Sequence, residues 1–176
     1  MTHRKKDIIE LTRCTVREYS EKEKLPVAVL LDNVRSMYNV GAIFRTADAF
    51  LIDSIILCGI SGCPPHPEIK KTALGAEDSV KWFYEKDAVE TAVRMKNEGW
   101  KICVLEQALD SIPLNKFSSL FGEKYLLVAG NEVEGVNQKI LDFADIVLEI
   151  PQYGVKHSLN VSVSVGIALW QMIKNF

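Results

Sequence analysis

Three stretches of the chain combine glycine with polar side chains that could hold a ligand and act on it. The first is NVGAIFRTADAF, residues 39–50, in which Asn39 begins the stretch and Arg45 follows six residues later. The second is LLVAGNEVEGV, residues 126–136, and the third is IPQYGVKHSLNVSVSVGIAL, residues 150–169. Glycine lets the backbone approach a ligand closely, while amide, hydroxyl and carboxylate groups supply hydrogen-bond donors and acceptors. We therefore expect the three stretches to meet at one polar site.

Each stretch also has a purely structural interpretation. Asn39 could cap a helix, because an asparagine oxygen accepts the free amides of a first turn. Arg45 could lie on the solvated face of that helix, and the glycines of the second stretch could only make a tight turn. Ser158 and Asn160 could cap the last helix. The individual residues leave these alternatives open.

Common catalytic, nucleotide-binding and metal-binding motifs fit poorly. No G-x-S-x-G elbow surrounds Ser158, and no G-x-G-x-x-G follows the first predicted strand. The second stretch lacks the Lys-[Ser/Thr] pair of a phosphate loop. Cys58, Cys63 and His66 could bind zinc, but they offer only three ligands, with two prolines between them. We expect buried or loop thiols here and no metal.

Composition places the chain among globular proteins of one domain. Of its 176 residues, 48% are hydrophobic and 25% are charged. Acidic residues cut or flank the longest apolar runs, which excludes a membrane span, and the basic N-terminus lacks the apolar stretch of a signal peptide. The four cysteines do not form a disulfide framework. We expect a cytoplasmic protein.

The net charge of −2 gives no overall electrostatic signature of nucleic-acid binding. Composition alone therefore weighs mildly against an RNA or DNA partner. Basic residues do gather locally, at Arg4, Lys5, Lys6, Arg13, Arg17, Lys70 and Lys71.

Apolar, β-branched runs alternate with helical patterns along the chain. The six predicted strands are residues 27–32, 54–59, 80–85, 101–107, 124–130 and 144–150. The predicted helices are residues 5–23, 40–50, 68–74, 88–98, 138–143 and 166–173, and the valine–serine alternation of 161–165 favours a further strand. This order is typical of an α/β domain with a largely parallel sheet, in which ligands bind at the carboxyl ends of the strands. Each of the three polar stretches lies where a predicted strand ends.

In order and spacing, the three stretches resemble the motifs of the SpoU/TrmH family of SPOUT-class RNA 2′-O-ribose methyltransferases. KTALGAEDSV, residues 71–80, also resembles a segment common in these enzymes, and the resemblance runs from about Val27 to the C-terminus. One departure is Gln152-Tyr153, which stands where many members carry a Met-containing turn. We expect no additional N-terminal substrate-binding domain, which leaves the RNA target open.

The resemblance implies a SPOUT-type, Rossmann-like α/β fold with a mostly parallel six-stranded sheet and a deep C-terminal trefoil knot. Residues 25–176 would form this domain, and residues 1–24 an N-terminal helical extension. In such a knot residues 161–165 begin a helix instead of forming a strand.

The implied activity is S-adenosylmethionine-dependent methyl transfer to a ribose 2′-hydroxyl of tRNA or rRNA. The implied catalytic residues are Asn39, Arg45, Glu132, Ser158 and Asn160. The implied cofactor-binding residues are Leu105, Glu106, Gly130, Asn131, Glu132, Gly135, Ile150, Pro151, Ser158, Leu159 and Asn160. Because a guanidinium keeps its proton at neutral pH, we expect Arg45 to grip a phosphate and stabilise the attacking oxygen instead of acting as a base.

The resemblance also implies a homodimer. We expect the C-terminal helix to offer apolar surface to it through Val161, Val165, Leu169, Trp170 and Ile173. Basic residues of one subunit, Arg4, Lys5, Arg13 and Arg17, would help to position RNA on the other.

Two other functions remain as alternatives. A knotted module could bind RNA or cofactor without transferring a methyl group. A small-molecule α/β enzyme could use Ser158, His157 or a cysteine as its nucleophile, which would require no cofactor.

Overall fold

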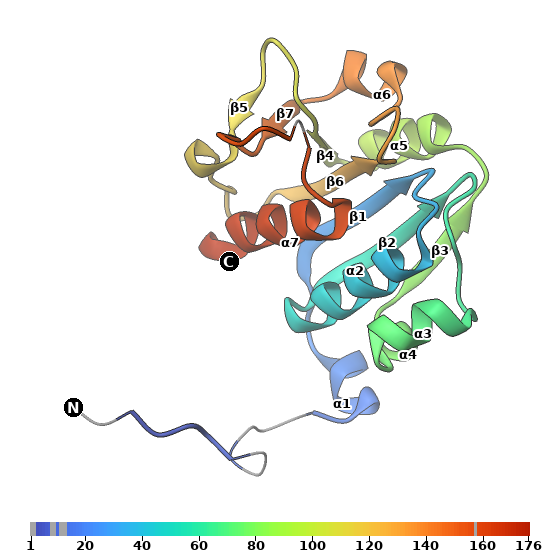
Figure 1. Cartoon of the computed structure of the whole chain (residues 1–176), viewed down its shortest axis with the longest axis vertical. Coiled ribbons are helices and arrows are strands. Elements are labelled where there is room, and N and C mark those ends of the chain that lie inside the picture. Colours follow the sequence, from blue (N-terminus) through green and yellow to red (C-terminus); the bar gives the residue numbers. More distant parts are fainter. Residues whose placement is uncertain (1–2, 8–9, 11–13, 157) are drawn as a thin grey trace.

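A computed structural model describes residues 3–7, 10, 14–156 and 158–176. It contains one parallel sheet with helices on both faces (Figure 1). The strands are β1 (Leu25–Asp32), β2 (Ile52–Cys58), β3 (Trp82–Glu85), β4 (Trp100–Leu105), β5 (Ile112–Pro113), β6 (Lys124–Gly130) and β7 (Ile146–Glu149). Their spatial order is β3-β2-β1-β6-β4-β7-β5, and every neighbouring pair is parallel.

The α/β class and the parallel sheet are confirmed, but the predicted number of six strands is wrong. The seventh strand, β5, has only two residues, one of them a proline, so it leaves no hydrophobic run in the sequence. It pairs through Ile112 and Pro113 with the end of β7 and forms one edge of the sheet.

The helices are α1 (Val16–Glu21), α2 (Met37–Ala49), α3 (Pro67–Ala73), α4 (Ala76–Ser79), α5 (Ala88–Asn97), α6 (Gln138–Phe143) and α7 (Val161–Met172). Short 3₁₀ turns follow at Leu114–Lys116 and Ile173–Asn175. Local capping sets several helix starts. Ser36 caps α2 by accepting the N–H of Asn39 at 3.3 Å, and Asp87 caps α5 by accepting the N–H of Glu90 at 2.9 Å.

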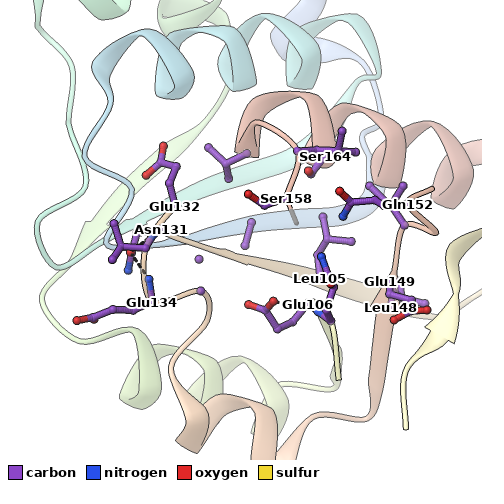
Figure 2. Close-up of a pocket in the computed structure, with 18 residues that line it drawn as sticks. Leu105, Glu106, Asn131, Glu132, Glu134, Leu148, Glu149, Gln152, Ser158 and Ser164 are labelled. Atoms are coloured by element: carbon purple, nitrogen blue, oxygen red, sulfur yellow. Dashed lines mark hydrogen bonds between the residues drawn. The ribbon is translucent and has the colours of Figure 1, made fainter. Parts of the chain in front are cut away.

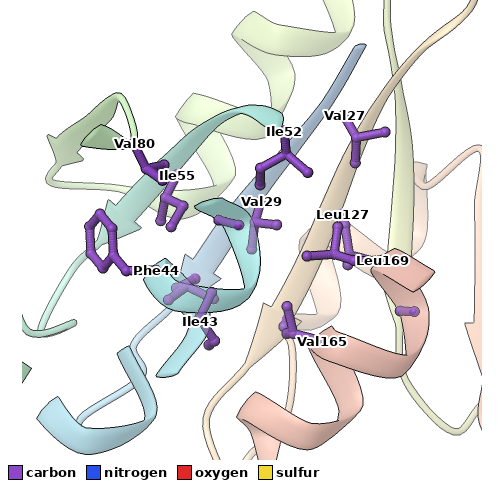
Figure 3. Close-up of a cluster of buried hydrophobic side chains, with 14 of the residues drawn as sticks. Val27, Val29, Ile43, Phe44, Ile52, Ile55, Val80, Leu127, Val165 and Leu169 are labelled. Carbon is purple, nitrogen blue, oxygen red and sulfur yellow. The ribbon is translucent and has the colours of Figure 1, made fainter. Parts of the chain in front are cut away.

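Two apolar layers hold the helices to the sheet. The larger layer lies under α2, α3, α4 and α7, and the smaller under α5 and α6. Figure 3 shows Ile43 and Phe44 of α2 in the larger layer, and Val165 and Leu169 of α7 near Leu127 of β6. Because both faces are covered, β1 and β6 are buried almost throughout, which explains their unbroken apolar sequences.

The predicted N-terminal helix, residues 5–23, is wrong over about half of its described length. Among the described residues of this region α-helix is limited to α1, Glu10 has 3₁₀ structure, and residues 3–7 are exposed and carry no helix. Residues 8, 9 and 11–13 of the prediction, including Arg13, lie outside the described residues. Two of the basic residues expected to meet RNA instead form exposed ion pairs, Arg4 with Glu10 at 2.6 Å and Arg17 with Glu21 at 3.1 Å.

Residues 161–165 are helical, as the resemblance implied, so the strand favoured by their alternation is wrong. The helix begins because the Asn160 side chain accepts the N–H groups of Ser162 and Val163. Alternation of small and apolar residues is compatible with a helix once such a cap fixes its start.

The predicted dimer surface of α7 is wrong for three of its five members. Val161, Val165 and Leu169 are buried within this protomer, whereas the apolar side chains that α7 exposes are Val163, Ile167 and Trp170. The trefoil knot and the division of the chain at residue 25 remain predictions, although β1 does begin at Leu25. No helix in the described part of the chain is long and apolar enough to cross a membrane.

Candidate active site

A cavity of about 430 Å³ lies at the carboxyl ends of β4, β6 and β7, beside the first turn of α7 (Figure 2). It is lined by most of the predicted cofactor residues: Leu105, Glu106, Gly130, Asn131, Glu132, Gly135, Ile150, Ser158 and Leu159. Pro151 and Asn160 were also predicted but do not line it. The second and third polar stretches therefore meet, as their places after β6 and β7 required.

The loop after β6 is closed by its own backbone and by Asn131. The Asn131 side-chain oxygen accepts the N–H groups of Val133 at 3.0 Å and Glu134 at 2.9 Å. The N–H of Gly135 donates to the Asn131 carbonyl at 3.1 Å. A Cβ on Gly130 would lie 2.0 Å from the carbonyl carbon of Gly135, so a side chain at Gly130 cannot coexist with this loop. The tight-turn interpretation of these glycines is correct, and the turn forms a wall of the cavity.

The carboxylate of Glu106, the residue after β4, holds the same loop in place. One of its carboxylate oxygens accepts the N–H of Val136 at 3.1 Å, and the other accepts the N–H of Gln107 at 2.9 Å. Gly135 has a φ of +70°, and a Cβ there would lie 2.2 Å from the first of these oxygens. The position therefore needs glycine both for its backbone conformation and for the approach of Glu106.

Three predicted catalytic residues form a chain of hydrogen bonds at the edge of the cavity. The amide nitrogen of Asn160 donates to the side-chain oxygen of Asn39 at 3.0 Å, and the amide nitrogen of Asn39 donates to Glu132 at 2.8 Å. The Asn160 oxygen caps α7, which leaves its nitrogen free to donate. The chain thus links the start of α7, the first turn of α2 and the loop after β6.

Of the two asparagines that could cap a helix, only Asn160 does so. Asn39 is not a cap, because Ser36 fills that role for α2. Asn160 is the cap of α7 as well as a member of the hydrogen-bond chain, and Ser158 lines the cavity instead of capping. Arg45 is exposed on α2, outside the cavity lining, and makes no ion pair with any residue that the structure describes.

Among the described residues, the cavity wall carries carboxylates and no basic side chain. Glu106, Glu132, Glu134 and Glu149 all line it. Glu132 and Glu149 already accept hydrogen bonds, the latter from the Ser111 hydroxyl at 2.7 Å. The net negative wall favours a ligand that carries positive charge.

Sequence reasoning missed part of the lining. The residues it did not assign are Gln107, Ala129, Val133, Glu134, Leu148, Glu149, Gln152, Val161 and Ser164. Most are immediate neighbours of predicted ones, so widening each strand end by one or two residues would have found them. Figure 2 shows Gln152 and Ser164 on the side of the cavity formed by the segment before α7 and by α7 itself.

A buried carboxylate ties the loop after β6 to the centre of the sheet. Asp32, at the end of β1, accepts the N–H of Asn137 at 2.9 Å and the side-chain amide of Asn33 at 2.8 Å. Burial raises the pKa of Asp32, although both hydrogen bonds oppose the shift. The carboxylate therefore costs some stability while it positions the segment that follows the cavity loop.

The cysteines do not provide an accessible nucleophile at the cavity. Burial raises the pKa values of Cys58 and Cys103 to about 12, which keeps both thiols protonated at neutral pH. His66 accepts the N–H of Glu68 at 3.3 Å and caps α3. Within the described residues no three potential ligands converge on a metal position. His157 lies outside the described residues.

Comparisons with known proteins agree with this geometry. The model of the SpoU rRNA Methylase family matches residues 26–170. The tRNA (guanosine(18)-2′-O)-methyltransferase of Aquifex aeolicus is 32% identical over 170 residues, which cover 93% of this chain and 76% of that protein.

Solved structures share the fold. The A. aeolicus TrmH/SpoU tRNA modifying enzyme superposes with a TM-score of 0.79 at 30% sequence identity. The match covers 90% of this chain and 79% of that enzyme. The AdoMet-bound rRNA methyltransferase from Sinorhizobium meliloti superposes with a TM-score of 0.77 at 26% sequence identity. The match covers 91% of this chain and 60% of the chain of that methyltransferase. The chain therefore belongs to the SpoU rRNA methylase family.

Proposed function

We propose that this protein is an S-adenosylmethionine-dependent methyltransferase that acts on a ribose 2′-hydroxyl of tRNA or rRNA. The observation that carries the proposal is the cavity together with the Asn160–Asn39–Glu132 hydrogen-bond chain at its edge, in a chain of this family. A relative with a 2′-O-methyltransferase name supports the reaction type.

The cavity suits the proposed cofactor in size and charge. A volume of about 430 Å³ is typical of small-molecule sites. The carboxylates of Glu106, Glu132, Glu134 and Glu149 match the positive charge of a sulfonium. When bound, S-adenosylmethionine supplies an electrophilic methyl group. Glycine-lined backbone from β6 and the segment after β7 would hold its adenosine and amino-acid parts.

The protein's own contribution is to align a weak oxygen nucleophile. Asn39 and Glu132 belong to the hydrogen-bond chain at the edge of the cavity, where we expect the ribose to enter, and their hydrogen bonds fix the direction in which each side chain points. Arg45 is one and a half turns further along α2, exposed and without an ion-pair partner among the described residues. We assign it to the phosphate next to the reacting ribose, where a guanidinium binds two oxygens and stabilises developing negative charge.

We also propose that two copies of the chain associate through α7. Val163, Ile167 and Trp170 are exposed by 50%, 41% and 59%, and the Trp170 ring lies 5.9 Å from that of Phe50. An apolar surface of this kind is typical of an interface between copies. Trp170→Asp should shift sedimentation toward the monomer, and a wild-type chain that sediments only as monomer at micromolar concentration contradicts the dimer.

The test of activity uses RNA from cells that lack the gene. The protein is incubated with labelled S-adenosylmethionine and, separately, with total tRNA and rRNA from those cells, and the nucleosides are analysed by mass spectrometry. We expect one 2′-O-methylated nucleoside to appear in one fraction. Cofactor binding by calorimetry without methyl transfer to either fraction would favour the binding-module alternative.

The four free cysteines fit the reducing cytoplasm, where we place this reaction.

A further inference from the structure

An exposed tyrosine directly precedes Asn39, a member of the hydrogen-bond chain at the edge of the cavity. Tyr38 lies in the first turn of α2, directly before Asn39, and is 43% exposed. The ammonium of Lys71, on α3, lies 5.8 Å from the centre of its ring. Asn39, the next residue along α2, binds Glu132 of the cavity wall, while the Tyr38 ring lies on the side of α2 that carries Lys71 of α3.

Close packing of α2 against α3 holds this tyrosine in place. A Cβ on Gly41 would lie 2.1 Å from the hydroxyl of Thr72 and 2.4 Å from the carbonyl oxygen of Ile69. The Thr72 hydroxyl donates to the Tyr38 carbonyl at 3.0 Å. The backbone that carries the ring is thus tied to the neighbouring helix. A ring on such a backbone loses little entropy when it binds a partner.

Besides Lys71, two other basic residues lie close to the tyrosine along the chain or on the neighbouring helix, Arg35 before α2 and Lys70 on α3. Arg35, Lys70 and Lys71 are exposed, and none forms an ion pair with a residue in the described part of the chain. Glu68 lies one turn before Lys71 on α3, but no ion pair joins them. By contrast, Arg94 of α5 pairs with Glu85 at 2.6 Å. Three exposed cations without ion-pair partners among the described residues therefore lie before α2 and on α3, and one of them, Lys71, lies at the aromatic ring.

We propose that Tyr38, Arg35, Lys70 and Lys71 form a stacking platform for an unpaired RNA base next to the nucleotide that is methylated. The proposal rests on the proposed function, because it places the RNA strand across the entrance of the same site. We expect the methylated nucleotide to lie in an unpaired segment, because the neighbouring bases of an open strand can stack on aromatic side chains. The three cations would neutralise the phosphates that flank this base.

Binding of a short single-stranded oligouridine tests the platform, because stacking on an aromatic ring tolerates any base and so does not require the natural target RNA. Tyr38→Leu should weaken oligouridine binding by roughly 5- to 100-fold, whereas Tyr38→Phe should bind like wild type, because stacking needs the ring alone. Lys71→Ala should lower the slope of log affinity against log salt by about 0.7, the value for one phosphate of a single strand. Cofactor affinity, measured by calorimetry, should stay within about twofold in all three variants, because neither residue lines the cavity.

The chain provides a matched control on the other edge of the sheet. Lys81 lies 5.0 Å from the ring centre of Phe83, which is 43% exposed on the edge strand β3. Phe83→Leu and Lys81→Ala remove a similar cation–aromatic pair away from the cavity and should leave oligouridine affinity unchanged.

The outcomes separate the platform from the proposed function. Unchanged oligouridine affinity in Tyr38→Leu, or an equal loss in Phe83→Leu, overturns the platform whether or not the protein methylates RNA. Changed sedimentation of Tyr38→Leu with normal oligouridine binding also overturns it, because the surface would then contact another copy of the chain. Loss of affinity specific to Tyr38→Leu supports the platform. If such a protein methylates neither tRNA nor rRNA, only the proposed reaction fails.

Discussion

Asn160→Asp should separate the two tasks of Asn160. In the native protein its oxygen caps α7, accepting the N–H of Ser162 at 2.9 Å, while its nitrogen donates to Asn39 at 3.0 Å. An aspartate keeps the oxygen that caps the helix but has no hydrogen to donate. Its second oxygen would face the oxygen of Asn39. If the Asn39 amide turns over to relieve this contact, its oxygen instead faces Glu132.

The expected magnitudes differ for folding and for catalysis. Asparagine and aspartate are similar N-caps, and a carboxylate at a helix start gains about 0.3–1 kcal/mol from the helix dipole. The cap itself should therefore cost nothing in the free energy of unfolding, which should change only through the Asn160–Asn39 contact. One hydrogen bond of the Asn160–Asn39–Glu132 chain is replaced by two oxygens that face each other, which costs about 1–3 kcal/mol. If this cost is felt in the transition state, methyl transfer slows by roughly 5- to 150-fold. Asn160→Ala loses the cap as well and should be less stable by about 0.5–2 kcal/mol.

The assay pairs urea unfolding with single-turnover methylation of the RNA fraction that the wild type modifies. Asn137→Asp is the matched control, since Asn137 caps α6 by accepting the N–H of Lys139 at 3.0 Å. Its amide nitrogen donates to none of the described residues. We expect Asn137→Asp to leave turnover unchanged. A normal rate in Asn160→Asp would refute a directed role for this amide.

Four further predictions concern the cavity loop, the helix α2 and the buried groups. Gly130→Val should abolish cofactor binding and lower stability even without cofactor, because its Cβ meets the facing backbone at 2.0 Å; unchanged calorimetric affinity in a folded protein would show that the pocket is misplaced. Arg45→Ala should slow single-turnover transfer by roughly 100-fold or more with cofactor affinity retained, and Arg45→Lys should restore little; a near-normal rate removes this residue from the chemistry. Cys58 and Cys103, with pKa values of about 12, should resist iodoacetamide at pH 8 until the protein unfolds, as peptide mass spectrometry can show. The ¹³C NMR titration of Asp32 should have its midpoint above the usual aspartate value, because burial raises its pKa; its contribution to stability then increases as the pH falls through that midpoint, and a midpoint at or below about 3.9 contradicts the argument.

The sequence by itself determined the class of fold and the place of the site. Unbroken apolar runs appear wherever a strand is covered on both faces, so β1, β2 and β6 were found within two residues of their bounds, and α6 was found with its bounds correct. Parallel strands bring their carboxyl ends to one edge, and this rule was sufficient to predict that residues after β6 and β7 share a site.

Local pattern failed where an element is stabilised by contacts from elsewhere. β5 is too short to have a period of its own and exists because β7 offers it an edge. The periodicity of the N-terminal residues suggested a long helix, but a helical pattern without packing against a core is marginally stable. On α7, sequence alone could not distinguish Val165, which meets the sheet, from Val163, which is exposed.

Only the tertiary structure decided how the polar residues act on one another. Asn39 and Asn160 are 121 positions apart, and Asn39 and Glu132 are 93 positions apart, so no local pattern can predict that they touch. The direction of their hydrogen bonds follows from the cap of α7, which occupies the oxygen of Asn160 and leaves its nitrogen for Asn39. Likewise, the sequence does not show why residues 130 and 135 must be glycine. In the structure, the loop backbone fills the space of a side chain at Gly130, and Glu106 fills the space of one at Gly135.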